Sequence, residues 1–246
     1  MTESLIYPDW PTPDCVKAVS TTRIGGFSLP PYDSFNLATH VEDNPVVVKK
    51  NRDYLVQIAQ LPEQARWLDQ VHSNKVITSP GWHEGVQADA MVSTVPNHVC
   101  SIMTADCLPI LLCNKQGTSV AAIHAGWRGL ASGIIEETLL RFPDDPSNII
   151  AWLGPAIGPE QFEVGHDVYN AFSAPYFDRG EAFIKRDADH YFTNIFQLAR
   201  QQLNHLGITT ISGGEHCTKS MSDQFFSYRK NNVTGRMATL IWITNE

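Results

Sequence analysis

Six short β-rich segments follow one another in the chain with no helix between them. They cover residues 67–71, 75–78, 89–93, 98–103, 108–113 and 118–124. A doubly wound parallel sheet needs a crossover helix between successive strands, and this run leaves no room for one. The order of elements therefore predicts an α+β sandwich, in which strands and helices are mixed without a regular βαβ alternation.

Helices are predicted on either side of this run. The first follows Asn44, which is suited to capping it, and ends before Pro62. Apolar residues at helical spacing predict further helices over 129–142 and 194–207, and a short one over 166–172. The remaining apolar or alternating segments predict strands at 16–23 and 148–154, and two strands around a turn at 231–232.

Composition excludes several classes of partner. The chain of 246 residues is 43% apolar and carries a net charge of −8, which argues against a nucleic-acid surface or an anionic membrane surface. No leader pattern and no apolar stretch of about 20 residues is present, and an odd count of five cysteines suggests a reducing compartment. We expect a cytoplasmic monomer or homodimer, with 1–246 forming one domain because no repeat or linker divides the chain.

Three residues with metal-binding side chains stand at the ends of apolar segments. His72 follows "RWLDQV", Cys107 precedes "LPILLC", and His124 ends "SVAAI". Nitrogen and sulfur donors suit zinc, and three protein ligands leave a fourth position open, as in catalytic zinc sites. Spacings of 34 and 16 residues are not diagnostic by themselves, so ordinary packing is the alternative interpretation.

Two arginines lie beside glycines at the ends of predicted strands. Arg128 stands in "HAGWRG", where the glycines allow close approach of a ligand and a helix begins. Arg23 stands in "STTRIGG". The planar guanidinium of an arginine at such a position is suited to binding phosphate. For both arginines, the alternative interpretation is a side chain that simply faces solvent in a turn.

Several motifs in order resemble the YfiH family, also described as the laccase-domain or polyphenol oxidase family. They are "STTRIGGFSLPPYDSFNLATHVEDNP", "LDQVHSNKV", "ADAMVS", "MTADCLPILLCN", "AAIHAGWRGL" and "WLGPAIGPEQFEVG". The resemblance runs from about residue 10 to the final predicted strand. It implies a layered α/β/β/α sandwich with mixed β-sheets, and a metal site of zinc type at His72, Cys107 and His124.

The resemblance also implies an activity. Family members are reported to cleave adenosine, inosine and methylthioadenosine with inorganic phosphate, and to deaminate adenosine. In that scheme Arg128 and Arg23 are candidates for binding phosphate, Asn36 for binding sugar or base, and Glu163 for moving protons. Phe225, Phe226 and Tyr228 are candidates for stacking on a base, with core packing the stronger expectation for at least one of the two phenylalanines.

Two other activities stay open at this point. The resemblance also implies copper-dependent phenol oxidation, which some relatives are reported to perform, although nine histidines with no His-x-His pair do not suit a multicopper relay. A cysteine hydrolase acting in peptidoglycan editing would use Cys107 as nucleophile, His72 or His124 as base, and Asp106 to orient the base. A shielded, metal-bound thiolate and a reactive nucleophile respond differently to alkylation.

Overall fold

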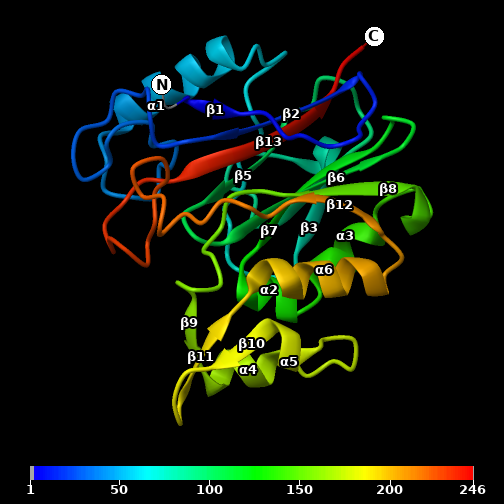
Figure 1. Ribbon diagram of the computed structural model, residues 1–246. Helices are drawn as coiled ribbons and strands as arrows, with labels where there is room; N and C mark the ends of the chain where they lie inside the picture. The colour runs from blue at the N-terminus through cyan, green and yellow to red at the C-terminus, as the bar shows by residue number, and fades with distance from the viewer. Residues whose placement is uncertain (1–2, 246) are drawn as a thin grey trace.

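The computed structural model describes residues 3–245, and its central layers are two β-sheets packed face to face (Figure 1). The larger sheet has six strands in the order β12-β8-β6-β7-β4-β3, with parallel pairs only at its two edges. Its strands are Thr210–Gly213, Ile149–Leu153, Leu108–Asn114, Val120–Ala125, Ala90–Ser93 and Val76–Thr78. The mixture of parallel and antiparallel pairing agrees with the absence of a βαβ alternation in the sequence.

The second sheet has four antiparallel strands in the order β1-β2-β13-β5. These strands are Leu5–Ile6, Val16–Thr21, Met237–Ile243 and Cys100–Thr104. The two sheets enclose an apolar cluster because alternate residues of each strand point to opposite faces. On β6, Leu111 and Cys113 enter this inner cluster, whereas Leu108, Ile110 and Leu112 face the other side.

Helices cover the outer faces of both sheets, which gives the four-layer α/β/β/α sandwich (Figure 1). The helix α1 (Pro45–Ile58) packs Leu55 against the four-stranded sheet, and the Asn44 side chain accepts from the Val46 N–H as predicted for its cap. The helices α2 (Trp127–Ala131), α3 (Ile134–Leu139) and α6 (Ile195–His205) lie on the six-stranded sheet.

A small three-stranded sheet lies at one end of the molecule, beyond these helices (Figure 1). It contains β9, β10 and β11 and is accompanied by two short helices, α4 and α5. The bounds of these five elements are Glu163–Gly165, Phe183–Lys185, His190–Thr193, His166–Ala171 and Arg179–Ala182. Short 3₁₀ turns occur at Ser79–Gly81 and Pro146–Asn148. No helix within residues 3–245 combines the length and apolarity needed to cross a bilayer.

Three of the predicted elements are wrong in the structure. The helix expected over 129–142 is two helices, because Gly133 takes a left-handed φ of 85° between α2 and α3. Residues 67–71 form a single isolated bridge, Asp69 to Gln87, and no strand. The Gln70 side chain hydrogen-bonds the backbone of Met103, donating to its carbonyl and accepting from its N–H. Of the two strands expected around 231–232, only β13 forms.

The packing between the two sheets predicts which apolar residues stabilise the fold. Leu111 is fully buried in the inner cluster, so Leu111→Ala leaves a cavity and should lower the free energy of unfolding by about 2 to 5 kcal/mol. Leu140→Ala is the matched control, because Leu140 is 76% exposed and its loss should cost no more than about 0.5 kcal/mol. Urea denaturation of both variants measures the difference, and equal stabilities would contradict the assignment.

Candidate metal centre

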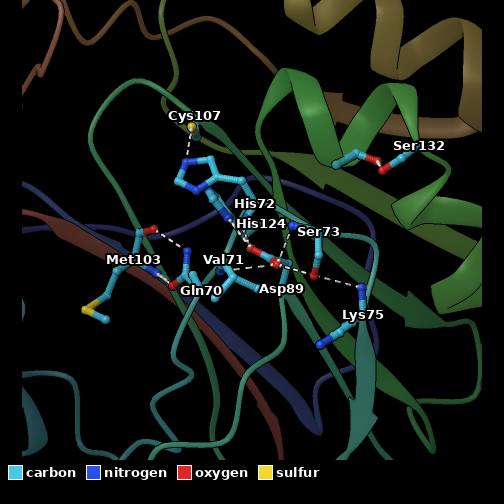
Figure 2. Close-up of polar contacts among 11 residues, drawn as sticks. Gln70, Val71, His72, Ser73, Lys75, Asp89, Met103, Cys107, His124 and Ser132 are labelled. Carbon is cyan, nitrogen blue, oxygen red and sulfur yellow. Dashed lines mark hydrogen bonds and ion pairs between the residues drawn. The ribbon is translucent and has the colours of Figure 1, made fainter. Parts of the chain in front are cut away.

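His72, Cys107 and His124 converge on one point at one end of the central strands β6 and β7 (Figure 2). His72 comes from the loop before β3, Cys107 from the turn that precedes β6, and His124 from the end of β7. Their ligand atoms all lie within 4.8 Å of one another, and 4.0 Å separates Cys107 Sγ from His72 Nε2. Three segments far apart in the sequence thus bring two imidazoles and a thiol together.

The carboxylate of Asp89 holds the loop that carries His72 (Figure 2). It accepts hydrogen bonds from the backbone N–H groups of Val71, His72 and Ser73 at 3.3, 3.0 and 2.7 Å, and from the Ser73 hydroxyl at 2.7 Å. His72 has a φ of 58°, a left-handed conformation that costs about 1 to 3 kcal/mol for a residue with a side chain. The convergent N–H donors offset that cost and fix the direction of the imidazole.

The same carboxylate orients His124. Asp89 Oδ1 lies 2.8 Å from His124 Nδ1, and the Asp89 carbonyl accepts from the His124 N–H at 2.7 Å. Because Nδ1 faces the carboxylate as a donor, Nε2 is left for a ligand on the Cys107 side. Sequence reasoning missed Asp89; its signal was a polar residue immediately before an apolar strand, in "ADAMVS", as with Cys107.

Electrostatics favour a charged pair at this point of the protein. Burial raises the pKa of Cys107, but His124 and His72 outweigh it and lower that pKa to about 6. Burial lowers the pKa of His124, but the Cys107 thiolate and Asp89 outweigh it and raise that pKa to about 9. Cys107 is therefore poised as a thiolate, which is the form that binds metal.

The donor set and its spacing fit a zinc ion. A tetrahedral zinc with Zn–N and Zn–S distances of about 2.1 and 2.3 Å places ligand atoms roughly 3.3 to 3.6 Å apart. The ligand atoms here lie within 4.8 Å of one another, so the side chains would have to close by roughly 1 Å to share one metal ion. Gly126 keeps the space open, since a Cβ there would lie 3.0 Å from Cys107 Sγ and 3.5 Å from the His72 ring.

Asp106 holds the turn before Cys107 and touches neither histidine within hydrogen-bonding distance. It has a φ of 91°, and its carboxylate accepts from the Thr218 hydroxyl and the Arg229 N–H, both at 2.6 Å. The orienting role that the hydrolase hypothesis gave to Asp106 is thus played by Asp89. Asp106 instead ties the Cys107 turn to the segment between β12 and β13.

A cavity of about 460 Å³ opens over the triad. Besides the triad it is lined by His40, Gln70, Met103, Thr104, Ala105, Tyr228 and Arg236. This volume lies in the range of small-molecule sites. A second cavity of about 650 Å³ shares His40 and Met103 with it, so the two compartments adjoin. In the second one, the Arg52 guanidinium lies 4.2 Å from the Trp67 ring.

Of the three tail aromatics, only Tyr228 lines this cavity. Phe225 and Phe226 are fully buried in a small core cluster with Met237, as the core-packing expectation had it. Most of the other residues that line the cavity were not identified in the sequence, because they come from loops and strand ends, where no periodic pattern marks them. Gln70 had a weak sequence signal, because it stands two residues before His72.

The four predicted substrate ligands lie outside the residues that line the triad cavity. The Arg23 guanidinium donates hydrogen bonds to the carbonyls of Asp33 and Ser222 and forms an ion pair with the Asp33 carboxylate. Arg128 is exposed at the start of α2 and stacks on Trp127 at 4.3 Å.

The other two predicted ligands also make contacts within the protein. Asn36 is fully buried, where its amide bonds Ala38, Asp43 and the Arg236 N–H. Glu163, the first residue of β9, forms an ion pair with Arg186, which directly follows β10, and both line a separate surface depression. The structure therefore brings together the predicted metal ligands, whereas the roles given to Arg23, Arg128, Asn36 and Glu163 stay predictions.

Fold and site together define an α/β/β/α sandwich with a His-Cys-His cluster able to hold a metal. The family described as multi-copper polyphenol oxidoreductase laccase matches residues 17–244, and the chain belongs to that family. Purine nucleoside phosphorylase YfiH of Escherichia coli is 52% identical over 97% of this chain and 98% of its own. These matches confirm the resemblance to the YfiH family.

Other relatives and solved structures agree. A Pseudomonas aeruginosa protein named purine nucleoside phosphorylase is 46% identical over 97% of this chain and 98% of its own length. The crystal structure of Neisseria meningitidis protein NMB0706 covers 99% of this chain and 100% of its own at 43% identity, with a TM-score of 0.94. YlmD of Geobacillus stearothermophilus, at 27% identity, has a TM-score of 0.87 over 94% of this chain and 93% of its own.

Replacing Asp89 tests its role in holding both histidines. Asp89→Asn should weaken zinc binding about 10- to 100-fold, because the buried carboxylate that orients His72 and His124 is lost. Competition with a chromophoric chelator measures the affinity, and circular dichroism checks the fold. Asp187→Asn is the matched control, since Asp187 pairs with His190 at 3.0 Å on the surface away from the triad. Wild-type affinity in Asp89→Asn would contradict the assignment.

Alkylation distinguishes a metal ligand from a free nucleophile. In chelator-treated protein, iodoacetamide should modify Cys107, with a rate that rises as pH increases through about 6, because the thiolate reacts. Stoichiometric zinc should protect it. Buried Cys100 and Cys113, whose pKa values burial raises to about 12, should stay unmodified and serve as internal controls. Mass spectrometry identifies the modified residue; full reactivity of Cys107 in zinc-loaded protein would favour the hydrolase.

Proposed function

We propose that this protein is a zinc-dependent purine nucleoside phosphorylase that also deaminates adenosine. The observation that carries the proposal is the His72–Cys107–His124 cluster under a cavity of small-molecule size, in a chain about half identical to proteins named purine nucleoside phosphorylase. The substrates are adenosine, inosine and methylthioadenosine with inorganic phosphate. We further propose that residues 1–246 act as one catalytic domain in the cytoplasm, as a monomer or homodimer.

The chain's own residues supply orientation and a defined compartment. A zinc ion on the triad would supply Lewis-acid polarisation of a substrate atom at its open position. Asp89 keeps His72 and His124 in the geometry and tautomer that such an ion requires. The adjoining cavity gives room for the parts of a nucleoside that do not react.

Phosphorolysis breaks one bond and forms one. An oxygen of dihydrogen phosphate attacks C1′ of the ribose, and the C1′–N9 bond breaks with its electron pair passing to the base. The proton from phosphate ends on a base nitrogen, so the products are free base and ribose 1-phosphate. The sequence-predicted roles enter here as proposals: Arg23 and Arg128 toward phosphate, Asn36 toward the nucleoside, and Glu163 toward proton transfer in deamination.

A second candidate is a cysteine hydrolase, and one observation favours it. Asp89, His124 and Cys107 stand in the order carboxylate, imidazole, thiol, as a catalytic triad does. A nucleophile needs one base, however, and here two imidazoles approach the same sulfur. Three converging donors suit a metal better, which is why we place the hydrolase second. Copper-dependent phenol oxidation at the same cluster is a third candidate, favoured by the family description.

Product analysis tests the proposal directly. Zinc-loaded protein is incubated with adenosine or inosine, with and without inorganic phosphate, and the products are separated by chromatography. Free base that appears only with phosphate, together with ribose 1-phosphate, is the expected result, and phosphate-independent inosine from adenosine would reveal the deaminase. Cys107→Ala is the control, and it should lose both zinc and activity. Unchanged nucleosides in every sample would refute the purine assignment.

A further inference from the structure

One permanent cation lines the triad cavity. Among the described residues around it, Arg236 is the only arginine or lysine. It lies just before β13, whose first residue pairs with Thr104, and Thr104 and Ala105 also line the cavity. The guanidinium therefore belongs to the same compartment as the three candidate metal ligands.

Only part of the Arg236 guanidinium is hydrogen-bonded to the protein. Its Nη1 donates to the carbonyls of Thr234 at 2.8 Å and Gly235 at 3.0 Å, and its Cζ lies 5.9 Å from the centre of the Tyr228 ring. Between residues 3 and 245, no carboxylate comes within 4.0 Å of Arg236, and Nε and Nη2 make no hydrogen bond. The Nε and Nη2 edge is the fork that binds two oxygens of a phosphate.

The backbone around Arg236 is held firmly. Its N–H donates to the Asn36 side chain at 3.0 Å, and its carbonyl accepts from the Leu37 N–H at 3.3 Å. Asn36 is itself fully buried and bonded to Asp43. A half-buried arginine with a fixed backbone and two bonds on Nη1 is ordered before any ligand arrives, which lowers the entropy cost of binding.

The two arginines that the sequence offered for phosphate are placed differently. In Arg23, Nε, Nη1 and Nη2 all face protein oxygens, those of Asp33 and Ser222. Arg128 is exposed and lies on Trp127, outside the residues lining the cavity. Neither presents an uncommitted fork to the space above Cys107.

We propose that the Nε and Nη2 edge of Arg236 binds the attacking phosphate beside the triad. This inference rests on the proposed phosphorolysis, and it adds the residue that orients the nucleophile. Bidentate binding leaves other phosphate oxygens free, so that one of them forms the bond to C1′ while the C1′–N9 bond breaks toward the base. Arg236 holds the ionised oxygens and gives up no proton, because a guanidinium stays charged.

Phosphate kinetics test the assignment. Arg236→Gln should raise the KM for inorganic phosphate about 10- to 100-fold, with the KM for inosine and the zinc content changed less than about threefold. Arg236→Lys keeps the charge without the fork and should fall between Arg236→Gln and wild type. Arg141→Gln, a surface arginine paired with Glu137, is the control and should match wild type. Arg23→Gln and Arg128→Gln are measured beside them.

Calorimetry with inorganic phosphate and, separately, with adenosine 5′-monophosphate separates free phosphate from a nucleotide phosphate group. Loss of inorganic phosphate binding in Arg236→Gln supports the proposal; loss confined to the nucleotide overturns it. An unchanged phosphate KM in Arg236→Gln, or a rise only in Arg128→Gln or Arg23→Gln, also overturns it. If phosphate binds through Arg236 but nucleosides are not cleaved, the proposed phosphorylase function is refuted while the phosphate site at Arg236 stands. If wild-type protein binds no phosphate, the inference fails whatever the activity.

Discussion

The candidate metal centre depends on the hydrogen bonds that the buried carboxylate of Asp89 accepts. It accepts four hydrogen bonds from the residues at 71–73 and faces His124 Nδ1 at 2.8 Å. Because it holds a loop on one side and a strand residue on the other, both imidazoles take their positions from one anion. Burial alone would raise the pKa of Asp89, yet the hydrogen bonds from His124 and Ser73 outweigh it and keep the group ionised.

The layered core delivers the other parts of the site to that anion. β6 and β7 pair along their length, which brings the turn holding Cys107 level with the end of β7 that holds His124. β13 pairs with β5 and carries Arg236 to the rim of the same cavity. Sheet register therefore sets the spacing of the candidate ligands, and loops supply their orientation.

Much of this arrangement was accessible from the sequence, and its limits have physical reasons. The places of Cys107 and His124 at strand ends were visible, because apolar runs identify strands, and the helix after Asn44 had clear capping signals. His72 was singled out at the end of a predicted strand that does not form. Gly133 was not recognised as a helix break, since a glycine in an amphipathic pattern does not reveal its φ. Asp89 and Arg236 were missed because their roles come from tertiary contacts. Likewise, nothing local in "STTRIGG" shows that Arg23 is occupied by Asp33 and Ser222.

The placement of β13 has a consequence for how the protein folds. Ser20 on β2 and Thr239 on β13 are hydrogen-bonded neighbours although they lie 219 positions apart in the sequence. Closing so long a loop is entropically unfavourable, and topologies rich in such contacts fold slowly. Arg236 stands directly before β13, so its place in the cavity wall depends on that long-range pairing. We therefore expect the wall to form only in chains whose two ends have already met, whereas β6 and β7, which lie close together in the sequence, can bring Cys107 and His124 together through a local contact.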